Sequence, residues 1–440
     1  MIVMMNQQTL SKITFGLFLH LSFLFAQADW QWSGAVEKDR AVVVAGVNPK
    51  AAKLRLVVSR KSDLSEPLFF EAVTRQAEGR TARFLAQGLK PSTLWYYAVE
   101  VDGRLPTDAK KIGSFKTFPE GPASFTFAMG ACSSEQNHKV FGRIVEKDPL
   151  FFLFDGDFHY ANPNGPDVET HRKAYETRVF SGTDQEEMLR RMSVAYVWDD
   201  HDYSGNDSDG SSKGRDFARR AFREYVPHFA LPAGEGGAIY QSFTVGRLRV
   251  IMSDVRSERE NGKVMSPAQR SWFEKEVLKA VADRQMIAWV TTYGWNGKIA
   301  DNWGGFPEER TSLSDFFRSA GASNLMIFSG DSHMLAIDDG ANCDFTSGKN
   351  GYAWPLFHAA ALVNKGSTKG VTGNVLSPAQ NITYSNESGS SKIVRSGQYG
   401  LVTVTDTGGK EMTISFRAMR VHPLTGEEEE LKKFEFKRSL

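Results

Sequence analysis

Short apolar runs that end in blocks of acidic, histidine and cysteine residues most constrain the fold of this chain. Beyond residue 124, apolar runs of four to six residues alternate with stretches of helical periodicity, a pattern typical of α/β proteins. Four runs, at 125–129, 150–154, 193–198 and 325–329, lead directly into polar blocks at 130–133, 155–160, 199–202 and 330–333. Because ligands of open α/β sheets bind beyond the carboxyl ends of the strands, we expect these blocks to meet in one crevice.

The polar blocks bring several carboxylates toward the same place. Asp157, Asp200 and Asp331 would repel one another strongly in one cleft unless cations neutralised them. Carboxylate oxygens suit hard cations such as Ca, Mn or Fe(III), and a thiolate or phenolate ligand favours iron. The further candidate ligands are His333, Cys132 and Tyr160. The sequence therefore predicts a hydrolase site with several metal ions, which would activate a water molecule against a phosphoryl group.

The stretch from residue 29 to about 120 has a different pattern, that of short alternating strands. We expect strands at 41–47, 53–59, 68–73, 81–86, 94–101 and 113–118, separated by turn residues such as Asn48-Pro49 and Asp102-Gly103. Regular short strands at this spacing predict a β-sandwich. The segment 89–97 resembles the corner before a late strand of fibronectin type III domains, with Trp95 where that pattern usually has Tyr.

Three helices and a set of C-terminal strands complete the prediction. We expect a helix that starts after the N-cap Ser266 and Pro267, a second over 307–320, and a third over 211–228. Strands at 355–363, 399–405, 411–420 and 434–437 are predicted to complete a second sheet, with a loop over 364–398.

The N-terminal residues have the features of an export signal. An apolar run at 13–26 follows Lys12 and is followed by Ala26-Gln27-Ala28, the small-x-small pattern of a signal peptidase site, so we expect cleavage after Ala28. As a helix the run would span about 21 Å, short of the ~30 Å hydrocarbon core, which makes a retained membrane anchor the weaker alternative. No later segment reaches spanning length, so the mature protein is predicted to be secreted or periplasmic without a transmembrane segment.

Charge and cysteine content exclude several classes of protein. The chain has 53 Lys and Arg against 52 Asp and Glu, which argues against general nucleic-acid binding because phosphate neutralisation needs an excess of basic residues. Two cysteines exclude a disulfide-built scaffold and a zinc site of four thiolates. A disulfide between Cys132 and Cys343 stays open at this point.

Six blocks, taken in order, resemble the alkaline phosphatase D family, phosphodiesterases within the calcineurin-like metallophosphatases. The matching blocks are Gly130-Ala131-Cys132-Ser133, Gly156-Asp157-Phe158-His159-Tyr160, Trp198-Asp199-Asp200-His201-Asp202, Asp254-Val255-Arg256, residues 301–307 with Glu309-Arg310, and Gly330-Asp331-Ser332-His333. The resemblance covers residues 121 to about 335. It implies a two-sheet αββα sandwich of the calcineurin-like type, with a catalytic core at 121–345 completed by strands at 346–440, preceded by a fibronectin III-like domain at 29–120 and the signal peptide at 1–28.

The resemblance also implies a role for individual residues. Asp157 falls on the aspartate that bridges the metal ions, while Cys132 and Tyr160 fall on ligands of Fe(III). His201 falls on the histidine that assists the leaving group, and the accessory cations are expected to be Ca2+. The remaining metal positions are Asp200, Asp331 and His333, and weaker substrate-binding candidates are Arg256 and His159.

We therefore expect an exported metal-dependent phosphoesterase that acts on a phosphate-ester small molecule or a phosphodiester polymer. Two alternatives stay open. A purple acid phosphatase-like enzyme shares the Gly-Asp-x-x-Tyr block at 156–160, but its late histidine motifs are missing from 291–293 and 330–333. A non-catalytic cell-surface binding protein would use the same acidic residues to hold structural calcium.

Overall fold

The N-terminal unit is built from seven strands in two layers. The computed structural model describes residues 27–349, 351, 354–385 and 391–440, so residues 1–26 of the predicted signal peptide lie outside the described part. One layer pairs β1, β2, β5 and the second half of β4, and the other pairs the first half of β4 with β3, β6 and β7. The strands are β1 (Trp30–Gly34), β2 (Arg40–Gly46), β3 (Leu54–Ser59), β4 (Leu68–Gln76), β5 (Thr81–Gln87), β6 (Leu94–Val101) and β7 (Gly113–Lys116).

All six strands predicted in this region are present, and β1 is an additional strand that the sequence analysis did not identify. β1 also joins the unit to the rest of the molecule, because Gly34 pairs in parallel with Val194. Trp30 supports this junction by stacking on Phe180 with ring centroids 4.0 Å apart.

The first sheet of the α/β region combines central and C-terminal segments. Its order is β10-β9-β8-β20-β21-β22, with β8, β9 and β10 parallel and the last three strands antiparallel. The strands are β8 (Phe125–Ser133), β9 (Phe152–Asp155), β10 (Val194–Val197), β20 (Gly397–Thr405), β21 (Glu411–Val421) and β22 (Glu428–Ser439). The helices between these segments are α1 (Lys139–Glu146), α2 (Val168–Ala174), α3 (Asp184–Arg191), α4 (Asp200–Tyr203) and α5 (Arg215–Tyr225).

The second sheet has the order β11-β12-β13-β14-β16-β15-β17 and is parallel from β12 through β16. Its strands are β11 (Gln241–Val245), β12 (Leu248–Met252), β13 (Met286–Val290), β14 (Leu325–Ser329), β15 (Met334–Asp338), β16 (Leu356–Val363) and β17 (Val375–Pro378). Its helices are α6 (Pro267–Ala282) and α7 (Pro307–Ser319). As expected, α6 begins after Ser266, whose side chain accepts a hydrogen bond from the Gln269 N–H.

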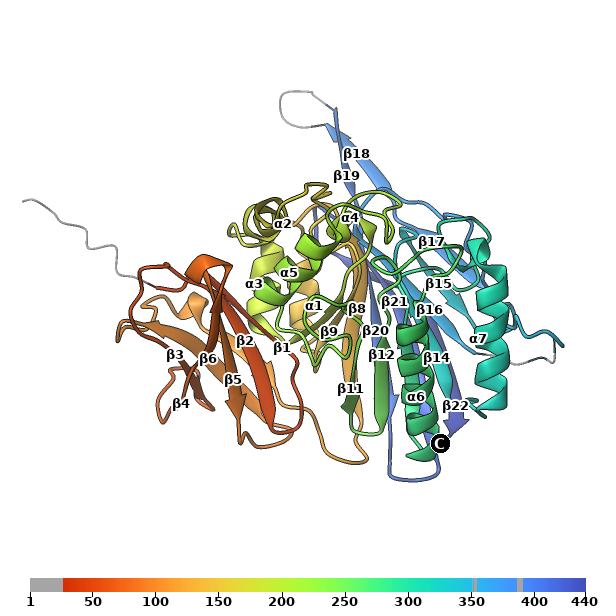
Figure 1. Ribbon diagram of the computed structural model, residues 1–440, viewed down its shortest axis with the longest axis horizontal. Helices are drawn as coiled ribbons and strands as arrows, with labels where there is room; N and C mark the ends of the chain where they lie inside the picture. The colour runs from red at the N-terminus through yellow and green to blue at the C-terminus, as the bar shows by residue number, and fades with distance from the viewer. Residues whose placement is uncertain (1–26, 350, 352–353, 386–390) are drawn as a thin grey trace, which may run out of the picture.

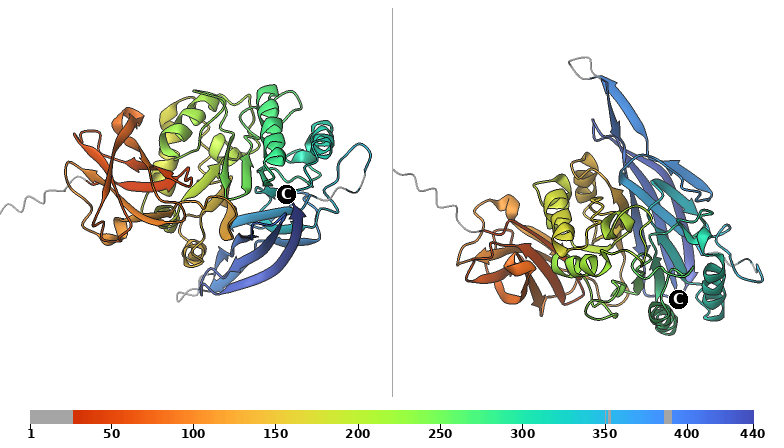
Figure 2. Two further views of the ribbon diagram at one scale, coloured as in Figure 1. Left: turned by 90° about the horizontal axis from the view of Figure 1, so that it is seen from below. Right: turned by 45° about the horizontal axis from the view of Figure 1, so that its top comes forward.

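The two sheets pack face to face with helices on the outside, and α6 and α7 cover the side opposite to α1 and α3 (Figure 1 and Figure 2). Aromatic side chains from both sheets fill the space between them; Phe357 of β16, for example, stacks on Phe416 of β21 at 4.7 Å. The sheets also meet directly, because β16 pairs with β8 at Ala360 and Ala131. The structure therefore has the layered α/β arrangement that the sequence predicts.

Two details differ from the sequence prediction. Of the four C-terminal strands, only β16 belongs to the second sheet; β20, β21 and β22 extend the first sheet beside β8. The expected loop at 364–398 contains β17, β18 (Asn381–Ser385) and β19 (Ser391–Arg395), and the last two form a hairpin that projects from the body (Figure 1). Within the described residues, no helix is long and apolar enough to cross a membrane.

Candidate metal centre

The four polar blocks lie at the ends of neighbouring strands, as the α/β pattern predicts. Cys132 is near the end of β8, Asp157 follows β9 by two residues, and Asp200 begins α4 three residues after the last residue of β10. Asp331 and His333 lie in the turn between β14 and β15 of the other sheet. The centre is therefore formed where the ends of both sheets meet.

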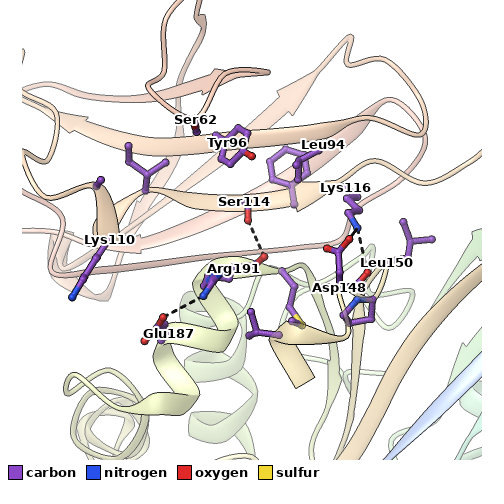
Figure 3. A pocket seen from close by; sticks show the side chains of 16 residues that line it. Ser62, Leu94, Tyr96, Lys110, Ser114, Lys116, Asp148, Leu150, Glu187 and Arg191 are labelled. Atoms are coloured by element: carbon purple, nitrogen blue, oxygen red, sulfur yellow. Dashed lines mark hydrogen bonds and ion pairs between the residues drawn. The ribbon is translucent and has the colours of Figure 1, made fainter. Parts of the chain in front are cut away.

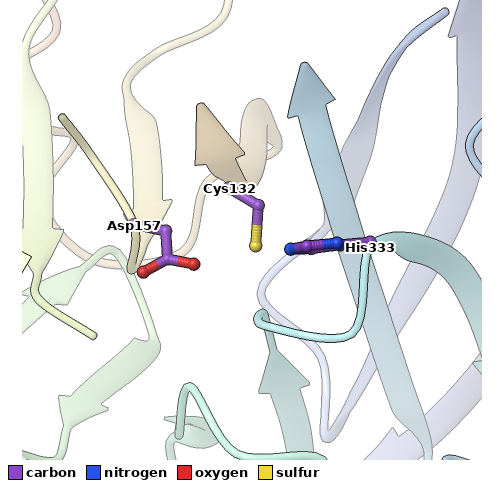
Figure 4. Close-up of side chains that lie close together, drawn as sticks. All are labelled: Cys132, Asp157 and His333. Carbon is purple, nitrogen blue, oxygen red and sulfur yellow. The ribbon is translucent and has the colours of Figure 1, made fainter. Parts of the chain in front are cut away.

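Two groups of side chains share Asp157. The first group consists of Cys132, Asp157 and His333, and the second of Asp157, Asp200 and His201. In each group, every residue offers one ligand atom, and these atoms lie within 4.8 Å of one another. Figure 4 shows Asp157 and His333 on either side of the Cys132 sulfur. These residues would hold cations, the first group through sulfur, nitrogen and oxygen atoms and the second mainly through oxygen atoms.

Tyr160 lies beside these groups. Its Oη is 3.0 Å from His333 Nε2, and its ring stacks on the His201 ring with centroids 4.0 Å apart. His201 is held in turn by Asn162, whose Oδ1 lies 2.6 Å from His201 Nδ1. Tyr160 thus connects the two groups that share Asp157.

The backbone at these positions has an uncommon conformation. The φ angles of Cys132, Asp157, Tyr160, Asp331 and His333 lie between 49° and 62°, in the left-handed region that non-glycine residues rarely adopt. Such conformations cost of order 1–3 kcal/mol each and cluster at functional sites. The surrounding fold therefore holds five candidate ligands in strained positions.

The chemistry of the donor atoms fits a bound cation. Both carboxylate oxygens of Asp157 are buried and have no hydrogen-bond partner among the described residues. Burial raises the pKa of Asp157 strongly, and the neighbouring Asp200 and Asp199 raise it further. Burial also raises the pKa of the Cys132 thiol and of the Tyr160 phenol, and the negative charge of Asp157 raises both further. The anionic forms of these groups therefore need a positive charge beside them.

Two further acidic groups adjoin the first two and already contact basic side chains. They consist of Asp199, Asp200 and Asp331, and of Asp200, Asp207 and Asp301.

The guanidinium of Arg256 is buried among these carboxylates. It contacts Asp199 through Nε, lies 3.6 Å from Asp200 Oδ2 through Nη2, and lies 2.9 Å from Asp301 Oδ1 through Nη1. Although burial raises the pKa of Asp200, Arg256 and His201 bring it below its ordinary value. Arg256 therefore lies in the centre as a counter-charge to its acids. The expectation that Arg256 binds substrate stays a prediction.

His159 lies outside the four groups of the described residues. The structure buries its ring edge-on against Tyr175, with centroids 5.0 Å apart, and its Nδ1 accepts a hydrogen bond from the Ala161 N–H. Burial lowers the pKa of His159 to about 4, so the imidazole is neutral. Because β9 ends at Asp155, Asp157 and His159 both lie beyond the strand.

The structure adds residues that the sequence analysis did not select. Asp207 lies with Asp200 and Asp301 in one of the four groups. Lys369 lies against Asp331, with Nζ 2.6 Å from Oδ1, although it belongs to the expected loop. No local pattern around Lys369 indicates this placement, since it depends on how residues 364–373 pack. Cys132 and Cys343, both within the described chain, are buried free thiols.

A cavity of about 560 Å³ lies elsewhere, between the N-terminal unit and the α/β region (Figure 3). Its lining includes Tyr96, Lys116, Asp148 and Arg191, and it shares no residue with the four groups. Within the described residues, the candidate metal ligands therefore lie apart from this cavity.

Comparison with known proteins agrees with this centre. The sequence model of the PhoD-like phosphatases matches residues 127–416. The chain belongs to the PhoD-like phosphatase family. Alkaline phosphatase D of Bacillus subtilis (strain 168) is 24% identical over 355 residues, which cover 67% of this chain and 58% of that protein. Purple acid phosphatase 15 of Arabidopsis thaliana is 21% identical over 245 residues, 50% of this chain and 42% of that protein. The chain thus spans about half the length of these curated relatives.

Solved structures show that the fold is shared as well. A structure of PhoD superimposes with a TM-score of 0.73 at 15% identity and covers 94% of this chain and 91% of its own. The purple acid phosphatase PPD1 of yellow lupin gives a TM-score of 0.57 at 12% identity, over 94% of this chain and 74% of its own. The chain is thus similar in sequence to an alkaline phosphatase and to a purple acid phosphatase.

Proposed function

We propose that this protein is an exported, metal-dependent phosphoric ester hydrolase of the alkaline phosphatase D type. The observation that carries the proposal is Asp157, which belongs to two ligand groups and has two buried oxygens without a partner in the described chain. A structural residue at this position would be expected to have a hydrogen-bond partner.

The two groups differ in their donor atoms, and so would their ions. Cys132, Tyr160 and His333 favour Fe(III) beside Asp157, while Asp157 and Asp200 offer the oxygen ligands that Ca2+ prefers. Asp331 Oδ2, buried and unpartnered within the described residues, is available to either ion. When bound, the metal ions would lower the pKa of a coordinated water and polarise the phosphoryl group.

His201 would deliver a proton to the leaving oxygen. Its Nδ1–H donates to Asn162 Oδ1, which fixes the ring, and the proton for the leaving oxygen comes from Nε2–H of the protonated imidazole, which is left neutral. Stacking on Tyr160 holds the same ring from its face. A substitution at His201 should therefore lower turnover while the fold stays intact.

We further propose that the domain boundaries follow the sequence pattern. These are a signal peptide at 1–28, a fibronectin III-like unit at 29–120, a catalytic core at 121–345 and completing strands at 346–440. The substrate would be a phosphate-ester small molecule or a phosphodiester polymer, with no general binding of nucleic acid. Export predicts that the mature protein starts at Asp29, which N-terminal sequencing of secreted protein would check.

The decisive experiment combines hydrolysis with metal analysis. Purified protein should hydrolyse p-nitrophenyl phosphate or bis(p-nitrophenyl) phosphate, and His201→Gln should reduce kcat by 10²–10⁴-fold with unchanged metal content. His422→Gln, a histidine far along the chain in the turn after β21, serves as the matched control. A wild-type protein that binds calcium without hydrolysing either ester would instead support the binding-protein alternative.

Absorption spectroscopy tests the iron assignment separately. Protein with Fe(III) should show a phenolate charge-transfer band that is lost in Tyr160→Phe and kept in Tyr96→Phe, a control at the separate cavity. A band that survives in Tyr160→Phe would exclude Tyr160 as the iron ligand.

A further inference from the structure

Lys369 places an ammonium group inside the acidic centre. Its Nζ lies 2.6 Å from Asp331 Oδ1 and 3.9 Å from Asp301 Oδ2, and the side chain is only 20% exposed. Both neighbours are carboxylates, which favour the charged form of the ammonium group. Lys369 therefore carries a full positive charge at the Asp331 side of the centre.

The main chain holds Lys369 in this position from several directions. Its carbonyl accepts a hydrogen bond from Asn302 Nδ2 at 3.1 Å, and the next carbonyl, of Gly370, accepts one from the Lys298 N–H at 3.2 Å. The Ser367 N–H donates to the carbonyl of His333, a candidate ligand. Lys369 itself has a φ of 38°, which the surrounding contacts must maintain. The backbone of Lys369 is thus held by the fold, and its Nζ by the contact with Asp331.

The decisive quantity is the 2.6 Å distance between Lys369 Nζ and Asp331 Oδ1. Calcium binds carboxylate oxygens at 2.3–2.6 Å, so an ion on Asp331 Oδ1 would need the space that the Lys369 nitrogen takes. Arg256 occupies the neighbouring acids in the same way, through contacts with Asp199 and Asp301. Of the carboxylates in the four groups, Asp157 alone has both oxygens without a partner in the described chain.

We propose that Lys369 takes the place of a metal ion at the Asp331–Asp301 side of the centre. The protein then binds two ions, both through Asp157, and binds no further calcium at the acids that Lys369 and Arg256 neutralise. This inference rests on the proposed metallophosphoesterase function and specifies how many ions that centre uses.

Metal stoichiometry tests the proposal without an activity assay. Wild-type protein equilibrated with calcium and analysed by mass spectrometry of its elements should hold two ions per chain. Lys369→Gln removes the charge and frees Oδ1 of Asp331, so this variant should hold three ions, the additional one being calcium. Lys369→Arg keeps the charge and should hold two. Lys365→Gln removes an exposed lysine from the same segment and should also hold two.

The outcomes separate the two proposals. A wild-type protein with no bound metal would overturn the proposed function together with this inference. A wild-type protein with three ions, or a folded Lys369→Gln variant that still holds two, would overturn only the role of Lys369. If Lys369→Gln does not fold without calcium, addition of Ca2+ should restore its melting transition, and failure of that rescue counts against the proposal.

Discussion

Acid should destabilise this protein through His358, a buried histidine below the turn that carries Asp331 and His333. His358 is fully buried in β16, and its Nε2 accepts a hydrogen bond from the Ser332 N–H at 3.2 Å. Burial lowers the pKa of this imidazole from 6.5 to about 3. The folded state therefore excludes a proton that the unfolded chain binds readily.

The size of the effect follows from proton linkage. Because the folded pKa is lowered, the stability is fully present above pH 6.5 and is lost as the pH falls toward 3. Each pH unit in this range costs about 1.4 kcal/mol, so at pH 4.5 His358 alone removes about 3 kcal/mol of unfolding free energy. This is a large part of the 5–15 kcal/mol that stabilises a typical domain.

Urea unfolding at a series of pH values between 7.5 and 4.5 measures this slope. His358→Gln keeps an acceptor for the Ser332 N–H but does not titrate, so its slope should be shallower than that of the wild type by about 1.4 kcal/mol per pH unit. His228→Gln should give a similar reduction, because burial and Arg83 lower the pKa of His228 to about 3. Identical slopes for wild type and His358→Gln would refute the reasoning.

Three other substitutions test the centre and its support. Asp157→Asn removes the ligand common to both groups, so both ions should bind more weakly and activity should fall by more than about 100-fold. Elemental analysis should then find less metal per chain. Glu224→Gln leaves the buried Arg172 without its bidentate partner and should lower the unfolding free energy by about 3–5 kcal/mol in denaturant titrations; no change would mean that water reaches Arg172. Gly330→Ala would force a Cβ against the Asp155 carbonyl oxygen and should cost about 1–3 kcal/mol by the same measurement, whereas an unchanged midpoint would show that the turn relaxes.

The sequence was sufficient to predict where the strands end and which polar residues follow them. That information is local, because an apolar run, a turn residue and an acidic block are adjacent in the chain, and parallel strands bring their carboxyl ends together. Cys132, Asp157, Asp200 and His333 are therefore brought together as expected.

Pairing partners and side-chain directions could not be predicted in the same way. β20 alternates as a strand should, but its sequence does not specify that β8, about 270 residues earlier, is its neighbour. The direction of His159 depends on left-handed backbone at Asp157 and Tyr160, which breaks the strand periodicity. Lys369 enters the centre only because residues 296–302 hold its loop.

Glycines beside the ligands explain how two sheets bring strained residues so close. A Cβ at Gly330 would collide with the Asp155 carbonyl oxygen, so this glycine lets the turn after β14 approach the end of β9. At Gly156, where φ is 90°, a Cβ would lie 2.7 Å from the Cβ of Asp199. Each of these glycines directly precedes an aspartate of the centre, Asp331 or Asp157. The two Gly-Asp pairs in the sequence thus have a structural reason. The glycine permits the close approach of the strand ends, and the aspartate that follows it therefore lies near the ligands of the other sheet.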